Sequence, residues 1–229
     1  MKPYIFLSEN YLKYAQDNNG DAIDAVNISV SDFPSTLTIY FADRYGNPTT
    51  RTIDTLILQD TNAKNLSVAY EESGSYSTLL TLANNTDSTV LLKAATPVQT
   101  SSIQITFGAT NPAELTAKMG IYGFICNLLA LTDSTYNIDA NNGGFRVVSG
   151  AYIHWADYKK WVAKIKMENL PQDQFNALTW QADTGEMTVI PYKDLEADEI
   201  HECAVARDYT YGVDRKTELF NLELELNEL

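Results

Sequence analysis

The side chains with the clearest capacity for chemistry are four oxygen donors in one polar loop, DNNGDAID at positions 17–24. Asp17, Asn19, Asp21 and Asp24 offer hard oxygen ligands at a spacing that favours calcium. The order of an EF-hand loop is not met, because a glycine precedes Asp21 and no glutamate closes the loop. Asn, Asp and Gly are also plain turn formers. The segment therefore predicts either a simple turn or a calcium site.

The chain has two histidines, His154 and His201. A zinc site would need further ligands close to them. His154 lies beside Trp155 in an apolar, aromatic run, and His201 lies between Glu199 and Glu202. We interpret each histidine as a packed or surface residue rather than as a metal ligand.

Motifs of nucleophilic or phosphate chemistry are missing from the sequence. There is no G-x-S-x-G, no glycine-rich phosphate loop and no cysteine with a matching histidine arrangement. The 30 acidic residues would bring some carboxylates together in clefts by chance, and no spacing selects one pair as glycosidase-like. The sequence therefore predicts a protein that is not an enzyme and that needs no cofactor, with calcium as the one candidate ion.

Aromatic and basic side chains gather in one segment of an otherwise acidic chain. Such a cluster suits a platform for stacking sugars or the centre of a protein interface. The alternative is that its tryptophans anchor a core and its lysines form a solvated edge. The alternating final strand is expected to add an edge for pairing with a partner. The predicted interface comprises Trp155, Tyr158, Lys159, Lys160, Trp161, Phe220, Leu222 and Leu224.

Composition restricts the partners. The 229 residues carry a formal charge of -14, which repels nucleic acid and anionic lipid. No apolar run approaches the length of a membrane span, and the run near the start is too short for a signal peptide. Cys126 and Cys203 lie among apolar or small residues and predict buried free thiols rather than a disulfide.

Periodicity predicts the elements that must position these groups. Apolar residues alternate with polar ones in strands over 36–42, 53–59, 66–70 and 102–107. A polar turn joins the second and third strands and predicts a β-hairpin or meander. The apolar run Gly120–Leu131 predicts one closing central strand.

A change in composition predicts two domains. Residues 132–144 lose apolar periodicity and gather Asn, Asp, Ser and Gly, so we expect domains over 1–133 and 143–229. A helix near 171–180 is expected in the second, because Pro171 suits a first-turn position and Asp173 complements the helix dipole.

The first domain resembles a known family. Its I-D-T-L-I-L strand, the turn at 62–65, the L-S-V-A-Y strand ending in E-S-G, S-I-Q-I-T-F and K-M-G-I-Y resemble a discoidin-type, galactose-binding-like sandwich. The resemblance implies an all-β chain with minor helix: a jelly-roll β-sandwich followed by a smaller β-rich domain with one short helix. Members of this family often bind glycans through loops, but the family's loop-joining cysteine pair is missing here.

The two halves together are similar to small structural proteins of tailed bacteriophages. The second half contributes V-V-S-G-A-Y, W-V-A-K-I-K-M-E-N-L and L-E-L-E-L-N-E-L. This resemblance implies a non-enzymatic virion component of the tail or baseplate, which contacts other virion proteins and copies of itself. The alternative is a carbohydrate-binding module that recognises cell-surface glycans through the sandwich.

Overall fold

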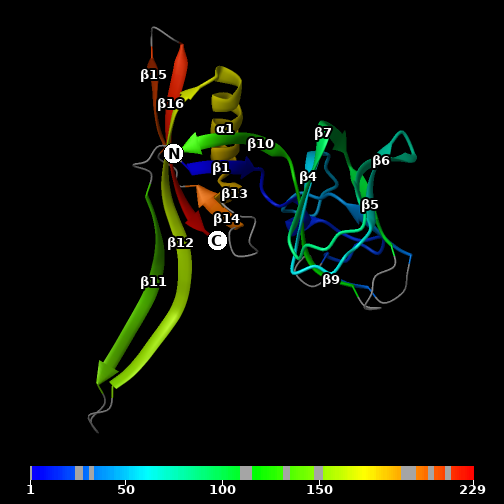
Figure 1. The fold of residues 1–229 in the computed structure, drawn as a ribbon, viewed down its shortest axis with the longest axis horizontal. Coiled ribbons are helices and arrows are strands. Elements are labelled where there is room, and N and C mark those ends of the chain that lie inside the picture. The colour runs from blue at the N-terminus through cyan, green and yellow to red at the C-terminus, as the bar shows by residue number, and fades with distance from the viewer. Residues whose placement is uncertain are drawn as a thin grey trace. The chain divides into compact units, whose positions relative to one another are not determined.

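The structure, a computed structural model, describes residues 2–23, 28–30, 34–108, 115–130, 135–146, 152–191, 200–205, 209–214 and 218–229. These residues form β-strands, one α-helix and one short 3₁₀ helix (Figure 1). The chain is thus mostly β with one helix, as the sequence predicts. It divides into two compact units, one of which contains residues 7–124 and the other residues 1–6, 125–193 and 200–229.

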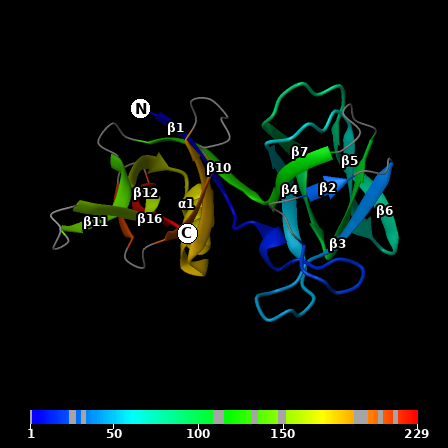
Figure 2. The same cartoon turned by 90° about the horizontal axis from the view of Figure 1, so that it is seen from below.

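The first unit is a jelly roll of two four-stranded sheets. One sheet has the order β2-β9-β4-β7 and the other β3-β8-β5-β6. Every connection from β2 to β9 except β5–β6 passes from one sheet to the other, which is the eight-stranded arrangement of a double-sheet jelly roll. The strands are β2 (Ile28–Val30), β3 (Ser35–Tyr40), β4 (Arg51–Gln59), β5 (Leu66–Glu72), β6 (Ser75–Leu82), β7 (Val90–Thr100), β8 (Ser102–Phe107) and β9 (Leu115–Tyr122). Figure 2 shows β4 and β7 in one layer and β5 and β6 in the other.

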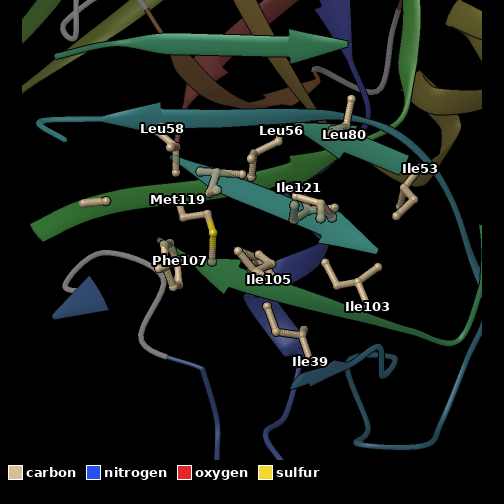
Figure 3. Packing of buried hydrophobic residues seen from close by; sticks show 14 of the residues in the cluster. Ile39, Ile53, Leu56, Leu58, Leu80, Ile103, Ile105, Phe107, Met119 and Ile121 are labelled. Atoms are coloured by element: carbon tan, nitrogen blue, oxygen red, sulfur yellow. The ribbon is translucent and has the colours of Figure 1, made fainter. Parts of the chain in front are cut away.

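The jelly roll is held by apolar side chains that alternate along its strands. Ile103, Ile105 and Phe107 of β8 are fully buried and point into one core with Ile121 and Met119 of β9 (Figure 3). Fully burying one such side chain stabilises a fold by about 1.5–3 kcal/mol. The predicted strands in this unit are therefore confirmed.

The predicted hairpin over residues 53–70 is wrong. β4 pairs with β7 and β9, whereas β5 pairs with β6 and β8 in the opposite sheet. The segment between them passes from one sheet to the other, and contacts of its residues hold it in place. Asn62 Oδ1 accepts a hydrogen bond from the backbone N of Thr116, and Ala63 is fully buried.

The second unit contains one eight-stranded sheet covered by a helix. The main strand order is β10-β1-β13-β14-β16-β12-β11, and β15 pairs with β16. Helix α1 (Gln172–Thr184) contacts β13 and β16. The strands are β1 (Lys2–Leu7), β10 (Phe124–Ala130), β11 (Thr135–Arg146), β12 (Tyr152–Leu170), β13 (Glu186–Pro191), β14 (His201–Val205), β15 (Thr210–Asp214) and β16 (Leu219–Glu228).

Helix α1 confirms the helix expected near 171–180 and extends four residues beyond it, to Thr184. It ends at Gly185, whose φ of 91° is left-handed and favours glycine. Phe175 on the helix stacks on Phe220 of β16 at a centroid distance of 4.3 Å. Leu178 and Ala182 complete the buried helix face.

Three expectations about organisation are corrected. β1 and β10 belong to the second unit's sheet, so the jelly roll is inserted in that unit's sequence and does not precede it. The described part of the predicted central strand, residues 120–130, belongs to two strands that part at Gly123, where a Cβ atom would lie 2.8 Å from the Thr52 carbonyl oxygen. Residues 135–142 of the expected boundary region lie within β11, because backbone pairing with β12 holds a strand that lacks apolar alternation.

Candidate ligand site

A cleft of about 390 Å³ opens in the jelly roll where the two sheets approach each other at one end. Its wall on one side is the end of β5 and the β5–β6 turn, and on the other side the end of β7. The lining side chains are mostly polar, with one aromatic ring and two carboxylates. They are Thr50, Tyr70, Glu71, Glu72, Ser73, Val98, Gln99, Thr100 and Ser101.

The corner between β7 and β8 forms the base of the cleft. Thr100 is buried, and its hydroxyl lies 3.0 Å from the carbonyl oxygen of Glu71 and 2.8 Å from that of Ser102. Its one proton serves either acceptor. Because Glu71 belongs to the opposite sheet, this side chain ties the two layers together and holds the cleft's walls at a fixed separation.

Tyr70 supplies the aromatic surface. Its ring is half-buried and packs, with Val98, against the jelly-roll core. Its hydroxyl donates to Glu72 Oε2 at 3.3 Å. The negative charge of Glu72 raises the pKa of Tyr70 above its ordinary value, so the phenol remains protonated and keeps its donor.

The β5–β6 turn holds the outer rim of the cleft in a defined shape. Ser73 and Gly74 both have positive φ, 53° and 84°, as a tight two-residue hairpin requires. The backbone N of Gly74 donates to Glu71 Oε1 at 2.6 Å. The turn geometry and this hydrogen bond together fix the position of the rim.

Gln99 and Thr50 add polar atoms at the β7 side. Gln99 Nε2 donates to Thr50 Oγ1 at 3.3 Å, and both side chains are exposed. The cleft therefore combines one ring face with hydroxyl, amide and carboxylate groups. This combination can bind a polyhydroxylated molecule by stacking and by several hydrogen bonds at once.

The predicted calcium loop is a hydrogen-bonded turn where the structure describes it. Asp17 Oδ1 accepts from the backbone N atoms of Asn19 and Asp21, at 2.8 and 2.9 Å. These bonds lower the pKa of Asp17. Asp24 lies outside the described residues. Within the part of the chain that is described, no group of three His, Cys, Asp or Glu side chains could hold a metal ion, so calcium stays a prediction.

The structure describes the side-chain contacts of one of the two histidines. His201 Nδ1 lies 3.0 Å from Glu228 Oε1, on neighbouring strands β14 and β16, and the side chain is half-buried. The backbone of His154 pairs with Gly144 in the β11–β12 hairpin, and its side chain is outside the description. Of the two cysteines, Cys203 is a free, buried thiol, as predicted.

The predicted interface residues are only partly brought together. Trp155, Tyr158, Lys159, Lys160 and Trp161 all lie on β12 where it pairs with β11, and their side chains are not described. Leu222 and Leu224 are buried in the core of the second unit, which corrects their assignment to an interface. β16 is an interior strand, because it pairs with β12, β14 and β15.

Sequence reasoning missed the cleft. Its members come from three segments between residues 50 and 101, and they converge only when β5 and β7 are placed in opposite sheets. One local signal was present, namely a tyrosine followed by the turn sequence Glu-Glu-Ser-Gly at 71–74.

Comparisons with known proteins concern the fold. The chain is similar to the family 32 carbohydrate-binding module of Streptococcus pneumoniae EndoD, with 11% identity over 49% of this chain and 98% of that one and a TM-score of 0.40. It is similar to the family 32 module of C. perfringens NanJ, solved with galactose, with 13% identity over 51% and 99% and a TM-score of 0.39. Discoidin II of Dictyostelium discoideum matches at 12% identity over 97% and 88%, with a TM-score of 0.34.

No protein-family model matches the chain, and no curated protein does either. The jelly-roll assignment stands on the strand order described above, and the fold class predicted from the sequence is confirmed. The structural matches give no support to a place in a phage tail or baseplate. No helix in the described ranges is long and apolar enough to cross a membrane.

Proposed function

We propose that this protein is a non-enzymatic carbohydrate-binding protein whose jelly roll takes a sugar in the cleft between β5 and β7. The observation that carries the proposal is the arrangement of Tyr70 among hydroxyl, amide and carboxylate groups in a cleft of about 390 Å³. Sugars present an apolar face and a rim of hydroxyls, so they bind to an aromatic ring flanked by hydrogen-bonding groups.

The size and rigidity of the cleft favour binding of one or two sugar units. The Thr100 bridge fixes its base, and the β5–β6 turn fixes its rim. A site whose side chains are already ordered loses less conformational entropy when a ligand binds.

A glycan array probed with the full chain tests the proposal. We expect selective binding that Tyr70→Ala weakens severalfold, up to about tenfold, because contacts with an aromatic ring contribute about 0.5–1.5 kcal/mol. Tyr211→Ala removes an exposed tyrosine from the second unit and should leave binding unchanged. Absence of binding to any glycan, or equal loss in both variants, would contradict the proposal.

A second candidate function is that of a subunit of a multi-copy assembly such as a bacteriophage virion. The observation that favours it is the β11–β12 hairpin. Residues 152–161 of β12 pair with β11 alone, since β12 reaches β16 only from Val162 onward. Figure 1 shows this two-stranded ribbon extending well beyond the rest of its sheet. An isolated two-stranded hairpin is marginally stable in water, so contacts with a neighbouring subunit would stabilise it.

Shortening the hairpin tests the second candidate. Residues 141–158 would be replaced by a two-residue Asn-Gly turn flanked by the paired residues Ala140 and Lys159, which leaves the pairing of β12 with β16 intact. An assembly subunit should lose its higher-mass species in native mass measurements while keeping its circular dichroism spectrum. An unchanged mass distribution, or a monomeric parent protein, would exclude self-assembly through this arm. Deleting β16 is not a suitable test, because that strand is interior to the sheet.

A further inference from the structure

The cleft in the jelly roll has an electrostatic feature that its shape and hydrogen-bonding groups do not explain. Its charged lining residues are Glu71 and Glu72, and no lysine or arginine is among the lining side chains. A sugar site for neutral ligands needs no net charge, and one for acidic sugars needs the opposite sign.

The two carboxylates are only partly used within the protein. Glu71 Oε1 accepts the Gly74 N–H and Glu72 Oε2 accepts the Tyr70 hydroxyl. Each group keeps a second oxygen that faces no ion-pair partner in the described part of the chain. The nearest arginine in sequence, Arg51, is engaged elsewhere, with its Nη1 3.2 Å from Glu9 Oε1.

The position of Glu72 relative to Tyr70 favours a cationic sugar substituent. The two residues stand two positions apart on β5, on the same face of the strand, and their side chains touch. A sugar ring stacked on Tyr70 would bring a ring substituent to the Glu72 carboxylate. An ammonium group there gains a charge-assisted hydrogen bond to Glu72, with Glu71 adding attraction at longer range, whereas a carboxylate substituent would be repelled.

We infer that the cleft selects amino sugars with a free, protonated amine over their N-acetylated and acidic counterparts. This inference rests on the proposed carbohydrate-binding function and adds the chemical class of the ligand. Acetylation removes the positive charge and adds bulk at the same atom, so the two forms of one oligosaccharide differ at the group that the carboxylates would contact.

Titration calorimetry with matched oligosaccharides tests this selectivity. The probes are a β-1,4-linked glucosamine tetramer and the corresponding N-acetylglucosamine tetramer, measured near pH 6 in low salt with the full chain. We expect the free amine form to bind about tenfold more tightly, which corresponds to about 1.4 kcal/mol. The preference should shrink as the salt concentration rises, because ions screen exposed charges.

Charge-neutralising variants assign the preference to the cleft. Glu72→Gln should reduce the preference for the free amine severalfold, measured as the ratio of the affinities of the same variant for the two tetramers. Asp87→Asn is the matched control, because it removes one negative charge from the β6–β7 connection, at the opposite end of β6 from the β5–β6 turn. The Asp87→Asn variant should prefer the free amine tetramer as strongly as the parent protein does.

The outcomes separate this inference from the proposed function. Equal affinity for the two tetramers, tighter binding of the acetylated form, or selectivity retained in Glu72→Gln would overturn the amino-sugar inference while leaving carbohydrate binding intact. Failure to bind either tetramer or any glycan on the array would overturn both. Equal loss of selectivity in Asp87→Asn and Glu72→Gln would show that overall charge is responsible, and would also overturn the inference.

Discussion

Apolar residues alternate with polar ones along strands of both the jelly roll and the eight-stranded sheet. The two regions differ in how far apart in the sequence their neighbouring strands lie. In the jelly roll, strands within residues 28–122 pair with one another. In the sheet, β1 is flanked by β10 and β13, which begin more than a hundred residues later. The jelly roll therefore encodes its core within one continuous segment, whereas the sheet depends on joining distant ones.

This difference explains which predictions from the sequence were confirmed. The alternation of Ile103, Ile105 and Phe107 identifies a strand and its buried face without knowledge of its partners. Helix α1 is also recognisable locally, because Pro171 and Gly185 bracket it. The strands with which a given strand pairs cannot be recognised locally in this way. Nothing in the sequence of β4 says that its neighbours are β7 and β9, and so the crossing between β4 and β5 was mistaken for a hairpin.

The same limit applies to the candidate site. Tyr70 and the turn after it are visible in the sequence, but Thr100 and Gln99 join them only through the corner between β7 and β8. The prediction of β16 as an exposed edge failed for a related reason. Its leucines show that one face is buried, and they carry no information about whether its backbone edges are paired.

Truncating a large buried side chain in each core tests most directly whether the jelly roll and the sheet are stabilised separately. Phe107→Ala in the jelly roll should cost about 3–5 kcal/mol, and Leu224→Ala in the sheet about 2–5 kcal/mol, since both side chains are fully buried. Each loss should appear in the truncated unit alone, as measured by hydrogen exchange under mild denaturant. Loss of protection in both units after either substitution would show that the two cores unfold together.

Alkaline pH should weaken the sheet through Cys203. Burial raises the pKa of this thiol to about 12. In the unfolded chain it ionises near its ordinary pKa of about 8.5. The unfolded state therefore binds fewer protons above that pH, and the free energy of unfolding should fall by about 1.4 kcal/mol per pH unit until the folded pKa is reached. Below the unfolded pKa this group contributes no pH dependence.

Urea unfolding between about pH 8.5 and 10.5 measures this effect as the difference in slope between the parent and Cys203→Ala. The parent should lose about 2 kcal/mol more than the variant across the interval. Parallel slopes would mean that the thiol ionises in the folded sheet as readily as in solvent.

Two glycines with positive φ allow one turn of the jelly roll to be compared with one turn of the second unit. Gly185 ends α1 at φ 91°, and Gly74 closes the β5–β6 turn at φ 84°. Alanine at either position should cost about 1 kcal/mol, because a Cβ atom disfavours left-handed backbone. Neither site has another atom within 4 Å of the new Cβ, so the cost reports backbone strain alone. Thermal unfolding measures it, and asparagine at the same positions should recover part of the loss.

The smallest effect is expected at an exposed ion pair of the sheet. Lys164 Nζ lies 2.6 Å from Glu223 Oε1, with the lysine side chain 48% exposed. Lys164→Met should change the free energy of unfolding by less than about 0.5 kcal/mol. In the jelly roll, Arg51→Met should cost more, because Arg51 is 22% exposed, pairs with Glu9 and covers the Tyr11 ring. If chemical denaturation gave the same loss of unfolding free energy for Lys164→Met and Arg51→Met, the two ion pairs would not differ in strength as expected.

The chain enters and leaves the jelly roll at two residues that are hydrogen-bonded to each other. The backbone N of Ser8 donates to the carbonyl oxygen of Gly123 at 2.9 Å, and the Gly123 N donates to Ser8 Oγ at the same distance. Ends this close can be rejoined by a short turn. The whole jelly roll can therefore be removed from the chain, or exchanged for another domain with adjacent ends, at a single in-frame site between β1 and β10.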